Sequence, residues 1–324
     1  MTTVERLSAP ACALSLALQR LRGGGVVALY HRVSDTPDPV YPPVPTALFE
    51  AHLDCIERDF RIIPLHEFVD RRRLGRSLRG CCALTFDDGY RDFLQNALPI
   101  LRRRGLHSTH FLTLDSLRSG RPTWNWRLNR VTLIRDANPC DMSLTRRVGR
   151  LTVSEREAYL ADLESAQSDL PPEPPLIGPD DLEDVDPGLV EWGSHTVSHA
   201  NLGACDGAAA RHELTASKCG LEARTGRRIR FLAYPNGSHS QAVQETAAEA
   251  GYEAAFAVEQ TEVRPDSPLF AIPRFDVWPV SPHRLRWELT GAVTRARGVR
   301  DWARRGRRVV FASAGTTAEE SDPR

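Results

Sequence analysis

The chain has 324 residues, of which 41% are hydrophobic and 26% are charged, as in an ordinary globular protein with one large or two smaller domains. Its 42 basic and 42 acidic residues give a formal net charge of +0, so no overall field favours nucleic acid or an anionic membrane as partner. The seven cysteines include no C-x-x-C pair, which favours reduced thiols in the cytoplasm over a disulfide framework or a cysteine metal site.

Residues 1–25 predict an N-terminal amphipathic helix that ends at the glycines 23–25. Glu5 and Arg6 precede a short apolar part, whereas a signal peptide begins with basic residues and ends at a small-residue cleavage site. No apolar stretch is long enough to span a bilayer. We therefore expect a cytoplasmic protein without a transmembrane segment, whose membrane contact, if any, is peripheral and made through this helix.

Strand-like and helix-like segments alternate over residues 26–283, which we expect to form the main domain. The predicted strands lie at 26–31, 61–69, 81–86, 108–113, 189–195, 228–235 and 252–259. The predicted helices lie at 46–60, 90–105, 207–226 and 240–251. This order is typical of an α/β protein with a mostly parallel sheet or a (β/α) barrel.

Two segments depart from the alternation. Residues 118–186 have helical patterns that lead into a Pro-rich, acidic stretch, which indicates a mainly helical insertion ending in a surface loop. Residues 284–324 begin with many arginines and end in small polar residues, which predicts a basic helix followed by a disordered tail.

Polar side chains stand where three predicted strands end. Asp87 and Asp88 follow the first of these strands, His195 the second and Asn236 the third. The carboxyl ends of parallel strands share one edge of a sheet or barrel, and active sites are built there. We therefore expect these residues to lie near one another.

His195 and His199 are four residues apart, a spacing that can place both imidazoles on one side of a helical turn around one metal ion. With one of the two aspartates they would make a three-ligand catalytic site that leaves positions for water and substrate. The other aspartate could then act as general base on the activated water. The alternatives are an ordinary Asp-Gly turn and two loop histidines.

These segments resemble the motifs of a known family. TFDDGY (85–90), SHTVSH (194–199) and RFLAYPNG (230–237) occur in the order found in the polysaccharide deacetylases, the NodB-homology group or carbohydrate esterase family 4. Its first motif, T-F-D-D-G, and its second, H-S/T-x-x-H, are intact here. The resemblance covers roughly residues 26–279.

The resemblance implies a deformed (β/α) barrel of the NodB-homology type and metal-dependent removal of acetyl groups from N-acetylated sugars. By motif position, Asp87 corresponds to the catalytic base. Asp88, His195 and His199 correspond to the metal ligands. Zinc suits two histidines and one aspartate, and cobalt, nickel, manganese or iron also fit such a set.

The third motif departs from the family's commonest form, F-R-x-P-Y-G. Ala233 stands where an arginine orients the base, and Asn236 stands where the backbone N–H of a tyrosine helps bind the oxyanion. A backbone donor survives a change of side chain, so an oxyanion- or substrate-binding role is implied for Asn236 and its neighbour Tyr234. Arg274 either replaces the missing arginine or makes a surface salt bridge, and both interpretations stay open.

The late motif of the family, an apolar-Leu-x-His segment, is not visible near the C-terminus. VALYHRV at 27–33 instead resembles the Y-H motif that opens the poly-N-acetylglucosamine deacetylase branch. His31 would then be the general acid that protonates the leaving amine, with a structural histidine as the alternative. His239 and His283 are weaker candidates.

Sugars stack on aromatic faces, so the tryptophans are further candidates for substrate contact. Trp124 and Trp126 lie in the predicted insertion and could line a substrate groove. Trp192 lies within a predicted strand, which favours core packing, and Trp278 follows Arg274.

We thus predict a metal-dependent hydrolase that removes an N-acetyl group from an amino sugar. The cytoplasmic location would restrict the substrate to precursors in glycan biosynthesis, such as a glycolipid or a nucleotide- or lipid-linked sugar, before the finished polysaccharide. One alternative keeps the site but opens another non-peptide C–N bond, in a ureide or cyclic amide. A second is a non-catalytic carbohydrate-binding protein.

Overall fold

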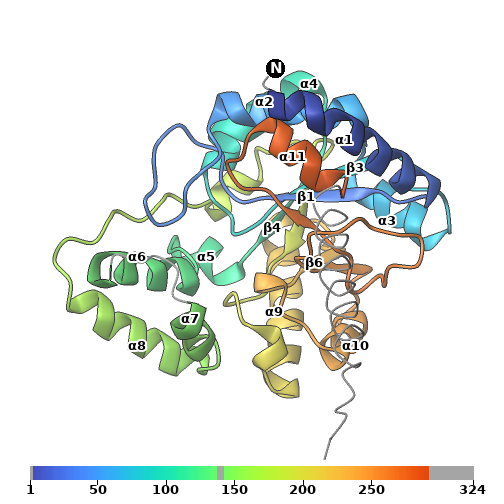
Figure 1. The fold of residues 1–324 in the computed structure, drawn as a ribbon. Coiled ribbons are helices and arrows are strands. Elements are labelled where there is room, and N and C mark those ends of the chain that lie inside the picture. Colours follow the sequence, from blue (N-terminus) through green and yellow to red (C-terminus); the bar gives the residue numbers. More distant parts are fainter. Residues whose placement is uncertain (1–2, 137–141, 292–324) are drawn as a thin grey trace, which may run out of the picture.

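The structure, a computed structural model, describes residues 3–136 and 142–291 (Figure 1). Its centre is one sheet of parallel strands in the order β7-β6-β5-β4-β3-β1-β8, with β2 paired to β3. The strands are β1 (Val26–Tyr30), β2 (Arg61–Ile62), β3 (Cys81–Phe86), β4 (Ser108–Leu112), β5 (Val190–Ser194), β6 (Phe231–Ala233), β7 (Ala254–Phe256) and β8 (Phe275–Asp276). The helices are α1 (Thr3–Leu21), α2 (Thr46–Asp59), α3 (Leu65–Arg73), α4 (Leu98–Arg104), α5 (Leu114–Ser119), α6 (Trp124–Asp136), α7 (Met142–Val148), α8 (Val153–Ser165), α9 (Gly207–Thr225), α10 (Gln241–Glu249) and α11 (Pro282–Leu289).

The sheet curls until its two edges approach each other. Beyond β7, the backbone N–H of Ala257 donates to the carbonyl of Ile272, and that of Glu259 donates to the carbonyl of Arg274. The segment that accepts these bonds runs into β8, which pairs with β1. Residues 272–276 therefore bridge β7 and β1, and the predicted deformed (β/α) barrel is confirmed.

Aromatic side chains fill the barrel interior. The ring of Phe256 lies 5.7 Å from that of Phe111 and 5.9 Å from that of Phe231. The ring of Phe111 leans against β5 at Gly193, where a Cβ atom would lie 2.4 Å from it. Only glycine allows this approach, so the small residue in β5 makes room for the ring that fills the barrel.

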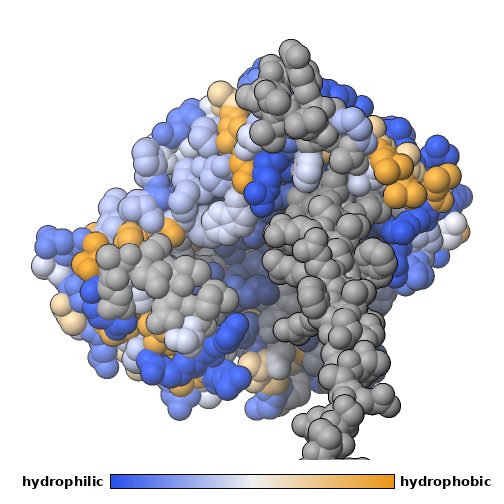
Figure 2. All heavy atoms as spheres, viewed as in Figure 1, coloured by the Kyte–Doolittle hydropathy of each residue, from blue (hydrophilic) through white to orange (hydrophobic). Residues whose placement is uncertain are grey.

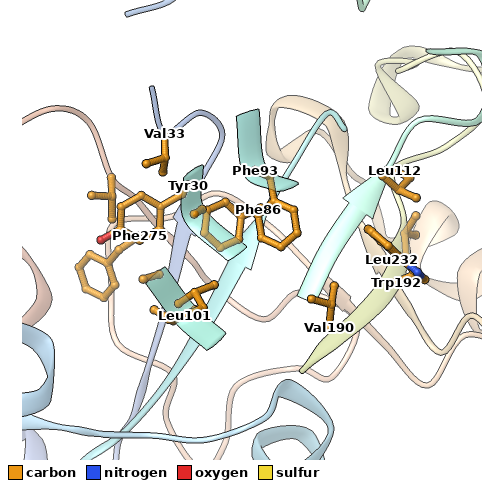
Figure 3. Packing of buried hydrophobic residues seen from close by; sticks show 14 of the residues in the cluster. Tyr30, Val33, Phe86, Phe93, Leu101, Leu112, Val190, Trp192, Leu232 and Phe275 are labelled. Atoms are coloured by element: carbon orange, nitrogen blue, oxygen red, sulfur yellow. The ribbon is translucent and has the colours of Figure 1, made fainter. Parts of the chain in front are cut away.

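The opposite face of the strands packs under the helices (Figure 3). Tyr30 of β1 stacks on Phe86 of β3 with ring centroids 5.6 Å apart, and Phe93 lies 4.8 Å from Phe86. All three rings are fully buried, and burial of one such side chain stabilises a fold by roughly 1.5–3 kcal/mol. Because both faces of the sheet are covered, side chains on both sides of each strand are buried, and the central strands are continuous apolar runs in the sequence.

Helices α6, α7 and α8 fall within residues 118–186, where a mainly helical insertion was predicted, and lie together to one side of the sheet in Figure 1; we refer to them as the insertion. It has a hydrophobic cluster of its own, separate from the clusters on the sheet. The buried members of this cluster are Trp124, Leu128, Leu144, Val148 and Leu160.

The strand predicted at 61–69 is wrong beyond Ile62. Pro64 has φ −55° and ψ 146°, and α3 begins directly after it. Leu65, Phe68 and Val69 are buried at helical spacing, so a short amphipathic helix explains the apolar residues that suggested a strand.

The helix predicted at the N-terminus is observed as α1, which ends at Leu21 before Gly23 with φ 72°. Leu14 and Leu21 are 64% and 78% exposed, and Figure 2 shows hydrophobic atoms at the C-terminal end of α1 among hydrophilic ones. No helix in the described ranges has both the length and the apolar character needed to cross a membrane. The predicted tail and most of the predicted basic helix at 284–324 lie outside the described residues.

Candidate metal centre

The loops after β3 and β5, two parallel strands on either side of β4, bring the predicted site residues together. Asp87 and Asp88 follow β3, while His195 and His199 belong to the loop after β5. The backbone N–H of Asp87 donates to the carbonyl of Tyr30 at the end of β1, which continues the β1–β3 ladder into the site. This hydrogen bond fixes the backbone position from which the two aspartate side chains extend.

Asp88, His195 and His199 form a compact buried cluster. Oδ1 of Asp88 lies 3.5 Å from Nε2 of His195 and 3.3 Å from Nε2 of His199. Ligand atoms of the three residues all lie within 4.8 Å of one another. Oδ1 of Asp88 is buried without a hydrogen-bond partner among the described residues, and such an oxygen is costly unless a cation faces it.

A backbone carbonyl orients His195. Its Nδ1–H donates to the carbonyl of Ala233, at 2.8 Å, which leaves the lone pair of Nε2 directed at Asp88. Burial lowers the pKa of His195 to about 4, although the charge of Asp87 opposes the shift, so the ring is neutral at pH 7. A neutral imidazole held through its other nitrogen is the form that binds a metal ion.

The backbone of these loops is strained. Among the described residues, four that are not glycine have positive φ, and all four lie in the loops around the cluster: Asp88 (73°), Thr196 (68°), His199 (56°) and Asn236 (54°). Each such conformation costs about 1–3 kcal/mol and persists only where surrounding contacts hold it. This concentration points to a functional site.

Arg274 holds Asp87. Its Nη1 and Nη2 donate to the two carboxylate oxygens of Asp87, both at 2.8 Å, and the guanidinium is 0% exposed. A surface salt bridge, one of the two interpretations of Arg274, is therefore excluded. Burial raises the pKa of Asp87, but the charges of Arg274 and His195 outweigh it, so the net pKa lies below its ordinary value.

His31 lies at the rim of the cluster. Its Nδ1 is 3.8 Å from Oδ1 of Asp276, and its ring is 5.2 Å from that of Tyr41. Asp276 was missed in the sequence, although a signal existed. It stands two residues after Arg274, and residues two apart in an extended segment point to the same side.

The remaining candidates are less central. Asn236 follows β6 in a left-handed turn. The hydroxyl of Tyr234 donates to the carbonyl of Phe270, and its ring stacks on His239 at 4.9 Å, so this side chain is already engaged away from the metal cluster. His283 packs against Trp287 in α11 and does not belong to the cluster.

Three of the four tryptophans considered as sugar contacts are buried. Trp124, Trp126 and Trp192 are each 2% exposed, so packing explains them and none offers an open face to a sugar. Trp278 is 43% exposed, and its ring lies 5.2 Å from that of Tyr41, beside His31.

A family model described as "Polysaccharide deacetylase" matches residues 75–255, more than half of the chain. The matched range contains both aspartates and both histidines of the cluster and ends before Arg274. No curated protein sequence matches the chain.

Solved structures show the same fold at low identity. Streptococcus pyogenes deacetylase PplD, solved in complex with acetate, is 16% identical with a TM-score of 0.55, and the match covers 82% of this chain and 98% of that one. A polysaccharide deacetylase from Bacillus cereus is 17% identical with a TM-score of 0.57, over 82% and 69% of the two chains. IcaB from Ammonifex degensii is 17% identical with a TM-score of 0.52, over 82% and 97%.

Proposed function

Because the chain belongs to the polysaccharide deacetylase family, and is a hydrolase of non-peptide carbon–nitrogen bonds, we propose that it removes an N-acetyl group from an amino sugar with the help of a divalent metal. The observation that carries the proposal is the buried cluster of Asp88, His195 and His199, with Asp87 beside it. The reaction consumes one water and gives acetate and a free amino sugar.

The donor atoms fit a divalent cation. Two imidazole nitrogens and an unpaired carboxylate oxygen converge, and the carbonyl of Ala233 fixes the tautomer of His195. Zinc suits this set, with cobalt, nickel, manganese or iron as alternatives. A cation held there by Asp88, His195 and His199 would supply Lewis-acid polarisation of the acetyl carbonyl and lower the pKa of the attacking water.

Asp87 serves as the base that takes a proton from the attacking water. Its Oδ2 lies 3.7 Å from Nε2 of His195, so the carboxylate borders the metal cluster. Arg274 binds both of its oxygens, which fixes the carboxylate plane and keeps the group ionised at neutral pH. A carboxylate oxygen accepts more than one hydrogen bond, so the pair with Arg274 leaves room for the water.

His31 serves as the acid that protonates the leaving amine. Asp276 faces Nδ1 of His31 and would hold the ring with Nε2 toward the substrate. The backbone N–H of Asn236 stabilises the oxyanion, because the turn after β6 lies next to the loop that carries His195. For Tyr234 we propose a supporting role, since its hydroxyl is bound to Phe270.

The substrate is an N-acetylated sugar in a polysaccharide, a glycolipid or a nucleotide- or lipid-linked precursor. The exposed ring of Trp278 lies near His31 through Tyr41 and offers a face on which a sugar ring can stack. The indole N–H of Trp278 donates to Oδ2 of Asp276, which ties this platform to the residue that faces the acid.

A peripheral membrane contact through α1 would bring the enzyme to a lipid-linked substrate. The exposed leucines Leu14 and Leu21 lie on one side of the helix, and Arg22 flanks them at its end. Sedimentation with vesicles of anionic lipid tests this contact, and the double change Leu14→Ser with Leu21→Ser should abolish it. A cytoplasmic location remains a prediction from the cysteine pattern.

The decisive experiment measures acetate release across acetylated polymers, glycolipids and nucleotide-linked sugars, with metal content determined in parallel. Acetate and a free amine from one class of sugar would support the proposal and name the substrate class. Turnover of ureides or cyclic amides alone would favour the other C–N hydrolase. Bound sugar and bound metal without turnover would favour a binding protein.

A further inference from the structure

The loop that carries both candidate histidine ligands, residues 195–199, is held from its outer side by three buried side chains. They come from helices that contribute nothing to the metal cluster itself: α6 and α8 of the insertion, and α9. Because Thr196 and His199 have positive φ, the loop needs such contacts to keep its shape.

The first contact comes from α9. The carboxylate of Glu213, 4% exposed, accepts the backbone N–H groups of Val197 (2.8 Å) and Ser198 (2.9 Å) through Oε2. Its Oε1 accepts the hydroxyl of Ser198 at 2.7 Å. This carboxylate therefore ties down the middle of the loop, between the two histidines.

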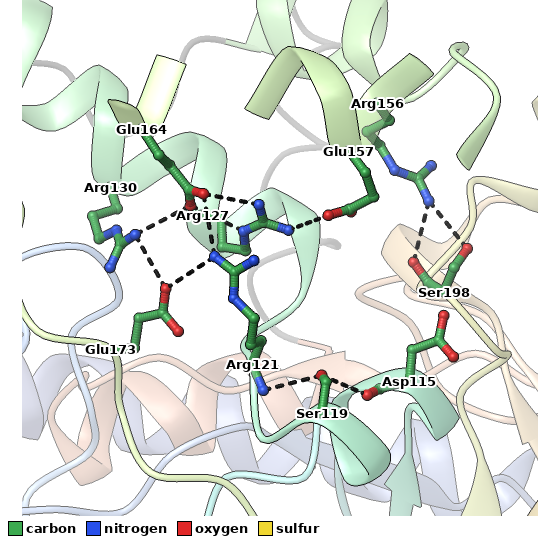
Figure 4. A network of polar contacts seen from close by, with 10 residues as sticks. All are labelled: Asp115, Ser119, Arg121, Arg127, Arg130, Arg156, Glu157, Glu164, Glu173 and Ser198. Atoms are coloured by element: carbon green, nitrogen blue, oxygen red, sulfur yellow. Dashed lines mark hydrogen bonds and ion pairs between the residues drawn. The ribbon is translucent and has the colours of Figure 1, made fainter. Parts of the chain in front are cut away.

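The second contact comes from α8 (Figure 4). Nη2 of Arg156 donates to the carbonyl of Ser198 at 3.4 Å and to its hydroxyl at 3.0 Å. The hydroxyl of Ser198 thus accepts from Arg156 and donates to Glu213, which links two buried charges of opposite sign through the loop. Arg156 is 2% exposed, so its guanidinium makes its hydrogen bonds with protein groups and not with solvent.

The third contact comes from α6. Nε1 of Trp124 donates to the carbonyl of His199 at 2.8 Å, and the guanidinium of Arg156 lies 5.1 Å from the indole ring. Trp124 belongs to the hydrophobic cluster of the insertion, so the packing of that cluster determines where its N–H points. The loop contacts of α6 and α8 therefore form one unit.

Ion pairs fix α6 and α8 relative to each other. Arg127, buried in α6, bonds to Glu157 at 2.6 Å and to both oxygens of Glu164 at 2.9 Å, all within the insertion (Figure 4). Arg130 adds a bond of 3.1 Å to Glu164. Such a network of bidentate contacts resists sliding of one helix past the other.

We propose that the helical insertion is a brace for the metal-binding loop: Trp124 and Arg156 are positioning residues that hold the carbonyls of His199 and Ser198, keep the strained backbone of this loop in place and so set how tightly the metal is retained. This inference rests on the metal site of the proposed function. It assigns the insertion a task that is separate from substrate contact, in agreement with the burial of its tryptophans.

The test compares Trp124→Phe with Trp126→Phe in the full-length protein. Both indoles are 2% exposed and lie in α6, but Nε1 of Trp126 has no hydrogen-bond partner among the described residues. Equilibrium Zn²⁺ affinity, by competition with a chelator, and the rate of Zn²⁺ release are the readouts. We expect Trp124→Phe to weaken affinity on the order of tenfold and to speed release, with Trp126→Phe like the wild type.

A second pair of variants guards against simple misfolding. Ser198→Ala removes the hydroxyl that links Arg156 to Glu213, while Ser198→Thr keeps it, so the alanine variant should lose Zn²⁺ affinity and the threonine variant should regain it. The proposal that the insertion acts as a brace would be overturned if Trp124→Phe and Ser198→Ala bound Zn²⁺ as tightly as the wild type. It would also be overturned if Trp126→Phe lost as much Zn²⁺ affinity as Trp124→Phe. Either result would leave the metal centre itself in place. A wild-type chain without Zn²⁺ affinity would overturn the metal centre itself.

Discussion

Arg274 donates two hydrogen bonds of 2.8 Å to the carboxylate of Asp87, which lies 187 residues earlier in the chain. The pair sits where the irregular segment that closes the barrel meets the end of β3. Nε of Arg274 also donates to the carbonyl of Ala257, and its guanidinium lies 5.3 Å from the ring of Phe111. The closure of the barrel and the position of the proposed base therefore depend on the same side chain.

Arg274→Met should lower both activity and stability. It leaves the carboxylate of Asp87 buried without its cation, and breaking such a pair costs about 3–5 kcal/mol of unfolding free energy. Without the arginine charge, burial dominates and the pKa of Asp87 rises, so the acidic limb of the kcat/KM profile moves to higher pH. Thermal unfolding and the pH–rate profile measure the two effects.

The matched control is Arg264→Met, because Arg264 is an exposed arginine whose partner, Asp266, is also exposed. This change should leave both measurements near the wild type. An unshifted acidic limb in Arg274→Met would contradict the assignment of Asp87 as the base.

Asp87→Asn and His195→Ala should distinguish the role of a general base from that of a metal ligand. Asp87→Asn removes a proton acceptor but none of the three convergent ligand atoms, so we expect metal to remain and most activity to be lost. His195→Ala removes a ligand, so metal and activity should both be lost. Elemental analysis with parallel acetate assays measures this, and His66→Ala, at a half-exposed histidine, is the control. Full activity in either test variant would refute the mechanism.

The loss of activity caused by His31→Ala should depend on the leaving group of the substrate. An amine must be protonated to leave, whereas the phenolate of an aryl acetate leaves without a proton. Loss of a general acid typically costs 10²–10⁴-fold, so we expect about this loss on an N-acetyl sugar and a much smaller one on the ester. His283→Ala in α11 is the control. Equal losses on both substrates would assign His31 a structural role.

The sequence allowed the site to be predicted where motif and chemistry agreed. Two aspartates after one apolar run and two histidines four apart predicted that these side chains lie together, and the structure brings ligand atoms of Asp88, His195 and His199 within 4.8 Å of one another. The partner of Asp87 was harder to predict, because the spacing of Arg274 along the chain carries no information about barrel closure. The loop contacts of Trp124 and Arg156 depend on tertiary packing alone and left no local signal.

The lengths of the short strands were predicted less well than the order of the elements. The observed β6 and β7 are each three residues long, although the strands predicted at 228–235 and 252–259 were eight residues long. Backbone pairing continues beyond both strands, since the N–H of Tyr234 donates to the carbonyl of Phe256 and that of Ala257 donates to the carbonyl of Ile272, in the irregular segment that closes the barrel. Local propensity could not foresee this, since tertiary pairing decides where a strand ends.

His110 should make the metal-free protein sensitive to mild acid. This β4 side chain is 0% exposed, and its Nε2 accepts the backbone N–H of Gly89, so the folded protein requires the neutral ring. Burial lowers its pKa to about 4, against about 6.5 in the unfolded chain. Between these values only the unfolded state binds the proton. The free energy of unfolding should therefore fall as pH drops from 6.5 to 4, by roughly 3 kcal/mol from this residue.

His110→Gln keeps an acceptor for Gly89 but cannot be protonated, so it should flatten this part of the stability curve, measured by urea unfolding of the chelator-treated protein. His195, with its pKa lowered to about 4, acts in the same direction, so some slope should remain. His66 is the control of opposite sign. The carboxylate of Glu191, whose Oε2 lies 3.8 Å from Nδ1 of His66, raises the pKa of His66. The stabilisation from His66 is therefore present below pH 6.5, and His66→Gln should make the loss of stability in acid slightly steeper. A curve for His110→Gln as steep as that of the wild type would show that His110 already accepts a proton in the folded state.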